Sequence, residues 1–251
     1  MATQVSFIKI NGTLGGLTFY KSANGDLIRT TGRVPKSRIL NDPVYARTRE
    51  NMSEFKNIAV SGKYLRMALA ALLKKATDNT VNRRLFTVLG KVKNLDVTSP
   101  RGSRQVAIGA ATPAGQAMFK GFDFNSKATL TTVLHAPFTM AIGTGEVDIV
   151  NFNPLTELII PGGATDVSFT AAVGIIDFTT GIYSLSQSPS VNLSVTAQPQ
   201  DISLTVAPLP DGTGIKMLLL LIEFFQEVNG TQYPLNNGNF NVLTTLDAVS
   251  E

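Results

Sequence analysis

Cysteine and tryptophan are absent from the 251 residues, and histidine occurs once, at His135. Without cysteine the chain cannot form disulfides, thiolate metal sites or a cysteine nucleophile. One histidine is also too few for a histidine-based metal site. A Ser-His-Asp triad would need a remote serine beside His135, and the sequence has no G-x-S-x-G nucleophile elbow. We therefore interpret His135 as a surface residue at a strand end and expect no enzyme, no catalytic residue, no metal and no cofactor.

Other patterns that support catalysis or ligand binding are also scarce. Glu146 and Asp148 are two residues apart, so on a strand both face the same way, but two carboxylates are too few for a calcium site. The glycine clusters at 12–16 and 161–163 lack the Gly-Lys-Ser/Thr ending of a phosphate loop, and neither has the pattern of a dinucleotide fingerprint. We interpret the carboxylates as a solvated strand face and the glycines as turns.

Long hydrophobic runs are missing as well. The longest, Met217–Ile222, is far shorter than the ~18 residues of a membrane helix. The start of the chain has no apolar stretch of the length a secretory signal needs. We expect a protein made in the cytoplasm without membrane contact, whose final location, such as an assembled particle or filament, stays open.

Acidic residues are few in the first half of the chain, and basic residues are nearly absent from the second half. Residues 128–251 hold one basic residue, Lys216, and eleven acidic ones, whereas residues 1–127 hold 21 basic and 7 acidic residues. The basic residues are densest in 29–104, with seventeen Lys and Arg against five acidic residues. Such asymmetry between halves indicates a charged partner.

The first hundred residues are predicted to form paired strands followed by short helices. Within 5–34, Asn24-Gly25 is typical of a hairpin turn. Asp42-Pro43 then predicts a helix start, because a carboxylate caps free amides and proline suits the first helical turn. Apolar spacing predicts three helices: one interrupted or bent at Gly62, a second just after it, and a third capped by Asp78. The apolar stripe of the first comprises Val44, Met52, Phe55 and Ile58.

The rest of the chain has the composition of a β protein. Residues 107–117, rich in Ala and Gly, are expected to be a linker between a basic N-terminal region, 1–125, and an acidic β-sandwich domain, 126–251. Beyond it, runs rich in Val, Ile, Thr and Phe recur at about ten-residue spacing. The predicted strands are 128–134, 138–142, 146–150, 156–160, 167–173, 175–185, 191–196, 202–206, 215–228, 231–235 and 240–246.

The run IKMLLLLIEFF at 215–225 does not alternate between apolar and polar residues, so we predict a central strand buried on both faces. The predicted fold class is α+β, mainly β: an N-terminal β-hairpin and short helices followed by an antiparallel β-sandwich, Ig-like or jelly-roll-like.

Four stretches of the chain have distinctive sequences: GTLGGLTFYKSANGDLIRTTG (12–32), NDPVYARTRENMSEF (41–55), TSPRG (98–102) and IEFFQEVNGTQYPLNNGNFN (222–241). In these stretches the chain resembles a group of proteins common in Bacteroidetes genomes. The blocks lie towards both ends, so the resemblance implies one continuous architecture. The group has no assigned activity, and the resemblance therefore implies no functional residues.

Two hypotheses for function follow from the charge pattern. A chain with oppositely charged halves is suited to head-to-tail contacts between copies, which can propagate into a filament, tube or virion-like particle. Strand sharing by the N-terminal arm would add to such contacts. The alternative is a nucleic-acid-binding protein that uses the basic stretch 29–104. Both hypotheses use the same candidate contact residues: Arg47, Arg49, Arg83, Arg84, Arg101 and Arg104. Whether the opposite charges meet within one chain or between chains is left open.

Overall fold

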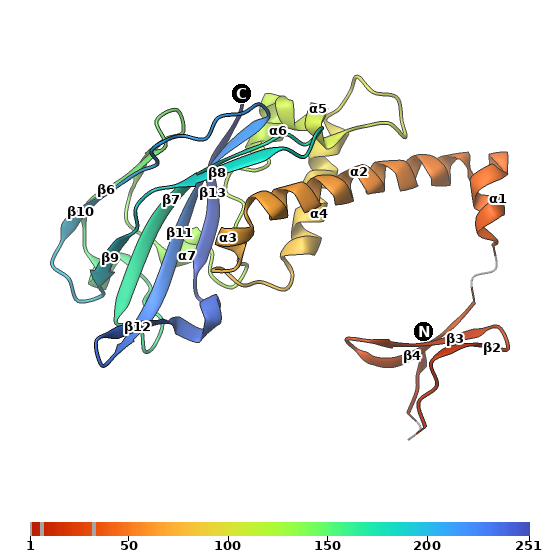
Figure 1. Ribbon diagram of the computed structural model, residues 1–251, viewed down its shortest axis with the longest axis horizontal. Helices are drawn as coiled ribbons and strands as arrows, with labels where there is room; N and C mark the ends of the chain where they lie inside the picture. The colour runs from red at the N-terminus through yellow and green to blue at the C-terminus, as the bar shows by residue number, and fades with distance from the viewer. Residues whose placement is uncertain (1, 6–7, 32–33) are drawn as a thin grey trace. The chain divides into compact units, whose positions relative to one another are not determined.

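The computed structural model describes residues 2–5, 8–31 and 34–251 (Figure 1). The chain consists of two compact units, Met1–Asn51 and Met52–Glu251, which we call the N-terminal unit and the main unit. The division falls within one helix, α2 (Ala46–Ala68). It does not fall at the predicted boundary between residues 125 and 126, because the helices after Met52 share a hydrophobic core with the strands.

The N-terminal unit contains a four-stranded antiparallel sheet in the order β1-β4-β3-β2. Its strands are β1 (Ala2–Thr3), β2 (Gly12–Leu14), β3 (Leu17–Ser22) and β4 (Gly25–Thr30). Gly15 and Gly16 join β2 to β3 with φ values of 58° and 78°, which suit a tight two-residue hairpin turn. The predicted paired strands are confirmed for 17–30, where β3 and β4 form a hairpin, whereas residues 8–10 are not in a strand.

A short helical segment follows the sheet, comprising α1 (Lys36–Asn41) and the 3-10 turn η1 (Pro43–Tyr45). The Asp42 carboxylate accepts the Val44 amide at 3.0 Å, and proline occupies the first position of the turn. The predicted helix start at Asp42-Pro43 is confirmed, although what begins there is a 3-10 turn that leads into α2.

The main unit has helices at its beginning and strands towards its end. After α2 come the helices α3 (Ala70–Leu73), α4 (Val81–Asn94), α5 (Val106–Ala111), α6 (Pro113–Ala117), α7 (Leu130–Val133) and α8 (Pro154–Glu157). The strands are β5 (Thr139–Ala141), β6 (Glu146–Phe152), β7 (Asp166–Ile176), β8 (Tyr183–Gln187), β9 (Val191–Ser194), β10 (Gln200–Thr205), β11 (Ile215–Val228), β12 (Thr231–Pro234) and β13 (Val242–Ser250), with the turn η2 (Leu235–Gly238) before β13.

The long strand β11 lies at the centre of a six-stranded sheet. It pairs antiparallel with β7 on one side, and with β13 and β12 on the other. Leu218 and Leu220 belong to one hydrophobic core, whereas Leu219 and Leu221 belong to a second core on the opposite face. The run does not alternate because both faces are covered, so the prediction of a doubly buried central strand is confirmed.

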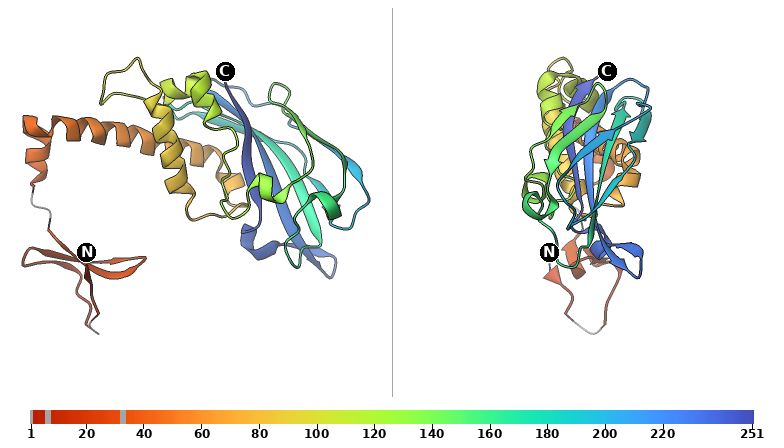
Figure 2. Two further views of the ribbon diagram at one scale, coloured as in Figure 1. Left: turned by 180° about the vertical axis from the view of Figure 1, so that it is seen from behind. Right: turned by 90° about the vertical axis from the view of Figure 1, so that its left-hand side faces the viewer.

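The two cores separate three layers. A three-stranded sheet, in the order β10-β6-β5, packs with α7 against one face of the six-stranded sheet. The end of α2 and the helices α4 and α5 pack against the other face. Figures 1 and 2 show β6 and β10 on one side of β7 and β11, and α4 and α5 on the other. The fold is α+β and mainly β, with a sandwich of antiparallel sheets, as predicted.

The helical part differs from the prediction in three places. Asp78 does not cap the third helix, because α4 begins at Val81 and its N-cap residue is Thr80. The helix α2 continues through Gly62, because Gly62 is the site where α4 approaches: a Cβ there would lie 3.3 Å from Leu89 Cδ1. The predicted linker 107–117 is wrong, since most of it folds into α5 and α6. A Cβ on Gly109 would lie 2.0 Å from the Val92 carbonyl oxygen, so the small residues permit close backbone packing.

Two of the predicted strands are helical turns. In 128–134 the buried side chains of Leu130 and Val133 are three residues apart, which suits the single turn of α7. In 156–160 the chain begins in α8, where Pro154 takes the first helical position and the Asn153 side chain accepts the Leu155 amide. Short apolar runs do not distinguish these turns from strands.

Candidate interaction surfaces

The helical layer of the main unit presents basic side chains to solvent. Its exposed cations include Lys56, Lys63, Arg83 and Lys91. The carboxylates of the same region are engaged inside the unit: Glu54, Asp78 and Asp96 are buried. The outer face of this layer is therefore positive because its negative charges lie beneath it.

The two predicted contact arginines of the N-terminal unit differ in their surroundings. Arg47 is largely exposed and forms a 2.9 Å ion pair with Glu50 one helical turn away. Arg49 donates from Nη1 to the carbonyl oxygens of Ile39 and Asp42, at 2.9 and 2.8 Å. Arg49 thus holds the end of α1, whereas Arg47 lies on the surface.

Arg84 has a structural role within the main unit. Its guanidinium forms a 2.6 Å ion pair with the buried carboxylate of Asp78 and donates to the carbonyl oxygens of Asp123 and Phe124. It also lies over the Phe122 ring, 5.4 Å from the centroid. These contacts fasten α4 to the segment beside β13. The neighbouring Arg83 is exposed, so only one of this pair faces solvent.

The loop that carries Arg101 and Arg104 is held from beneath by two buried carboxylates. Asp96 accepts the amides of Thr98, Ser99 and Gln105 at 3.0–3.1 Å. Burial by itself would raise the pKa of Asp96, but these hydrogen bonds outweigh it and hold the pKa well below its usual range. The loop backbone is fixed, so it presents Arg101 to solvent from a defined position.

The second carboxylate, Glu54, lies in a small buried network. It accepts a hydrogen bond from the Lys93 ammonium and a 2.8 Å hydrogen bond from the Gly102 amide. Arg104 Nε lies 3.7 Å from the same carboxylate. Burial opposes ionisation, yet the hydrogen bonds from Lys93 and Gly102 lower the pKa of Glu54 overall. Arg104 is therefore partly used in holding the loop.

The outer face of the three-stranded sheet is acidic. Val147 and Ile149 of β6 point into the core, so the alternate residues Glu146 and Asp148 point outwards. Asp201 of the neighbouring strand β10 is exposed and accepts the Asn151 amide. Because the sheets lie between this face and the helices, the main unit has an acidic surface on one side and a basic surface on the other.

Part of the charge is neutralised within the chain. Lys75 pairs with Glu223 at 2.8 Å, and Lys120 lies 3.4 Å from Asp247. Each pair joins a cation from residues 1–127 to a carboxylate from residues 128–251. Contacts within one molecule thus account for some of the charge pattern, and the exposed groups remain available to partners.

The sheet of the N-terminal unit has an apolar face without a core beneath it. Cross-strand register places Leu14, Leu17, Phe19 and Ile28 on the same face. Among the residues of this unit that the structure describes, the one buried side chain is the polar Gln4. Leu14 is 68% exposed, and Val5, Ile8 and Ile10 are exposed beside it. The alternation in 14–19 could have revealed this surface from the sequence.

A pair of aromatic side chains lies on the helical layer. Phe55 of α2 and Phe86 of α4 have ring centroids 5.9 Å apart, and Phe55 is 56% exposed. Val44 and Met52 of the predicted apolar stripe are exposed too, so only Ile58 of that stripe is buried. Helical periodicity correctly placed these residues on one apolar face, but in the described structure the part of that face at Val44, Met52 and Phe55 is exposed.

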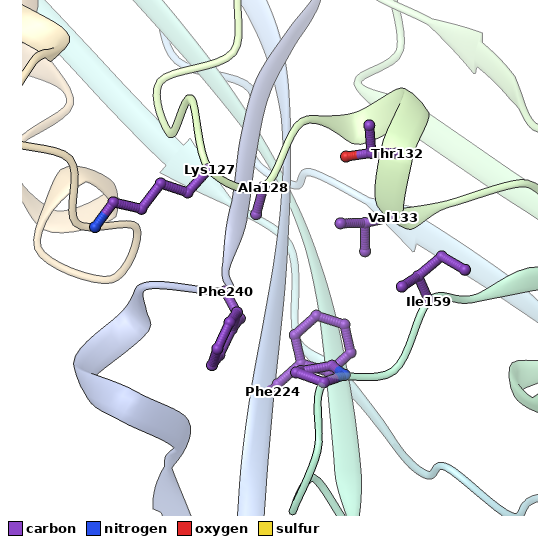
Figure 3. A pocket seen from close by; sticks show the side chains of 8 residues that line it. Lys127, Ala128, Thr132, Val133, Ile159, Phe224 and Phe240 are labelled. Carbon is purple, nitrogen blue, oxygen red and sulfur yellow. The ribbon is translucent and has the colours of Figure 1, made fainter.

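One apolar hollow of about 300 Å³ lies between α7, β11 and the segment before β13. Figure 3 shows Phe224, Phe240, Val133 and Ile159 converging there, while the Lys127 side chain extends away from them. Its lining residues are Lys127, Ala128, Thr132, Val133, Ile159, Pro161, Phe224 and Phe240. No pair of titratable groups meets in this lining, so the hollow suits an apolar group and contains no acid–base pair.

Within the described ranges, the histidine and the carboxylates do not form a metal site. His135 is exposed, and its backbone amide donates to the Glu157 carbonyl oxygen. Those ranges contain no group of three or more His, Asp or Glu side chains placed to hold a metal ion. They also contain no helix that is both long and apolar enough to span a membrane.

The fold defines the class of the protein as a mainly β, α+β chain with a helical layer on a sandwich. No family model matches the chain, and neither a curated protein nor a solved structure matches it.

Proposed function

We propose that the protein is a non-enzymatic structural subunit that assembles with copies of itself into a filament, tube or virion-like particle. The observation that carries the proposal is the N-terminal unit, which exposes an apolar face and buries no apolar side chain among its described residues. Isolated small sheets are only marginally stable in water. A second copy that covers this face would provide the missing core.

The charge distribution supports the same proposal. A unit with a basic helical face and an acidic sheet face favours heterologous contacts, in which different surfaces of two copies meet. Such contacts continue from copy to copy unless they close into a ring. Complementary potentials would also set the orientation of successive subunits. Exposed residues such as Arg83 and Arg101 are the candidate contacts on the basic side, and Arg49 and Arg84 support the fold.

Sizing and imaging of the purified protein test the proposal. We expect light scattering and negative-stain electron microscopy to show large, regular particles that form without nucleic acid. Because the contacts are partly ionic, the particles should dissociate as salt is raised. A monodisperse monomer at high protein concentration and low salt would contradict the proposal.

Nucleic-acid binding is the second candidate, and the exposed Phe55–Phe86 pair favours it. Aromatic rings beside cations such as Arg83 are typical of surfaces on which bases stack. Against it, Arg49, Arg84 and Arg104 are engaged within the chain. A protein that stays monomeric alone and forms a complex only with added DNA or RNA would favour this candidate over assembly.

A further inference from the structure

One edge of the six-stranded sheet is formed by β8 and, further along β7, by β9; the part formed by β8 is open. On its inner side β8 pairs with β7 from Ala172 to Ile176. Among the described residues, no backbone hydrogen bond is made to the outer side of β8. The opposite edge is different, because Gly121 and Phe124 donate backbone hydrogen bonds to β13. The β8 edge therefore has backbone donors and acceptors available for another strand.

The sequence of β8 contains none of the features that usually protect such an edge. Tyr-Ser-Leu-Ser-Gln (183–187) includes no charge and no proline. The edge strand β10, by contrast, carries Asp201, and β12 ends in Pro234. At the start of β8, Ile182 is 72% and Tyr183 is 41% exposed. The edge thus combines free backbone groups with an exposed apolar end.

Two carboxylates lie beside this apolar end. Asp177 and Asp211 line a hollow of about 220 Å³ together with Ile182, Tyr183 and Ser184. Asp177 already accepts the Thr179 amide and the Thr180 hydroxyl at 2.7 Å, so its position is fixed by its own turn. Asp211 is exposed and accepts no hydrogen bond in the described structure. This corner of the main unit is negative as well as apolar.

The N-terminal unit has the complementary properties. Residues 1–51 contain eight basic and three acidic residues. Lys21 follows Leu17 and Phe19 at two-residue spacing on β3, so its side chain borders the apolar face. Lys21 is exposed and forms no ion pair within the described ranges; its cross-strand neighbour on β4 is Asp26, which lies 3.8 Å from the Lys9 ammonium. The edge strand β2, with Leu14 exposed, lies at one side of this sheet.

We propose that the N-terminal unit of one copy docks on the β8 edge of a second copy. Strand β2 adds to β8, the face that bears Leu14 and Leu17 covers Ile182 and Tyr183, and Lys21 meets the carboxylates of Asp177 and Asp211. Strand addition supplies main-chain hydrogen bonds, and the apolar and charged contacts fix the register. This inference rests on the proposed function and names the surfaces that carry the assembly.

Charge reversal on the two surfaces tests the docking. Asp211→Lys changes an exposed side chain and should keep the unfolding temperature of the original protein. Lys21→Glu places a second carboxylate opposite Asp26 on β4, so its unfolding temperature is measured alongside its assembly. Each alone should weaken assembly about tenfold, because one apposed pair becomes repulsive. An equimolar mixture should regain most of the assembly, since every contact joins opposite charges when the two variants alternate along the assembly. Undiminished assembly of both single variants, or no recovery on mixing, would overturn the docking.

Cysteine cross-linking identifies the contact directly, because the chain has no cysteine of its own. Leu14→Cys in one copy and Ile182→Cys in another should form an oxidised heterodimer in the mixed assembly. Leu14→Cys mixed with Val97→Cys or Val150→Cys is the control, since Val97 is 89% and Val150 is 71% exposed on other faces. Preferential cross-linking to either control would place the N-terminal unit elsewhere and overturn the docking. If the original protein stayed monomeric, the proposed function would fail with it.

Discussion

Buried carboxylates organise the basic part of the chain at the level of single residues. Asp78, Asp96 and Glu54 each lie beneath a segment rich in cations and accept several hydrogen bonds from its backbone or side chains. Although burial opposes it, these bonds lower the pKa of all three carboxyl groups. The negative charge that the sequence places in this region thus shapes the backbone and contributes little to the surface.

Asp96→Asn is expected to destabilise the main unit by about 2 kcal/mol at pH 7. In Asp96→Asn the side-chain NH2 group faces the Gln105 amide, so two donors meet and this hydrogen bond is lost. Charge-assisted hydrogen bonds of this kind contribute roughly 1.5–3 kcal/mol. Urea unfolding at fixed pH measures the difference. If the variant matched the original protein, the loop would not depend on this carboxylate.

The same substitution should flatten the dependence of stability on pH. In the folded protein the pKa of Asp96 lies below its ordinary value of 3.8, so the stabilisation is present above pH ~5 and is lost as pH falls through the folded pKa. Between pH 5 and about pH 2 the unfolding temperature of Asp96→Asn should therefore fall less steeply than that of the original protein. Parallel curves would show that Asp96 does not contribute through ionisation.

Close helix packing depends on Gly109. A Cβ at this position would lie 2.0 Å from the Val92 carbonyl oxygen, so Gly109→Ala must push α5 away from α4. We expect a loss of about 3 kcal/mol, in the upper part of the range for overpacked cores. Gly143→Ala is the matched control: its Cβ meets no atom within 4 Å and its φ is not positive, so it should be close to neutral. Equal stability of the two variants, measured by thermal unfolding, would exclude the close approach.

At the level of elements, β11 joins both cores. Leu219→Ala and Leu220→Ala remove side chains from opposite faces of the strand, and each should cost about 3 kcal/mol, as large-to-small core changes do. Val228→Ala, at the half-exposed end of the same strand, should cost less than about 1 kcal/mol. Denaturant unfolding compares the three. A small effect of either leucine would mean that one face of the sheet is open.

Elements with strong local patterns were predictable and short ones were not. The Asn24-Gly25 turn and the apolar stripe of helix α4 are clear local patterns. The apolar run of β11 fits a helix or a strand by its periodicity, and the Asn229-Gly230 turn directly after it favours the strand. The turns α7 and α8 contain four residues each, so the apolar residues in them fit either structure. The role of Gly109 was not predictable, because its neighbour Val92 lies on another helix.

At the scale of the whole molecule, the two units should differ in local stability. The sheet of the N-terminal unit lacks a buried apolar core among its described residues, whereas β7 is buried along its whole length. In dilute monomer we expect the amides of β3 and β4 to exchange hydrogen at least about 100-fold faster than those of β7. Under assembly conditions the exchange of β3 and β4 should slow markedly. Strong protection of these strands at every concentration would mean that a partner surface is not required.

The candidate contact residues were predictable only in part. Their positive charge follows from the sequence, but the exposed Arg83 and the inward-facing Arg84 are adjacent and chemically identical. Asp78 and the carbonyl oxygens of Asp123 and Phe124 bring Arg84 inward, and Asp123 and Phe124 are about forty residues away along the chain. The open edge at β8, beside Asp211, was not predictable because an open sheet edge depends on the order of the strands.

The sequence alone determined the division of charge, the N-terminal hairpins, the mainly β class and the doubly buried central strand. Each is fixed by composition or by a pattern within one continuous segment. The tertiary structure alone decided that the units divide at Asn51, that Phe55 is exposed and that β8 has an open edge. Whether a surface is covered depends on elements that are distant in the chain, and a local pattern does not contain that information.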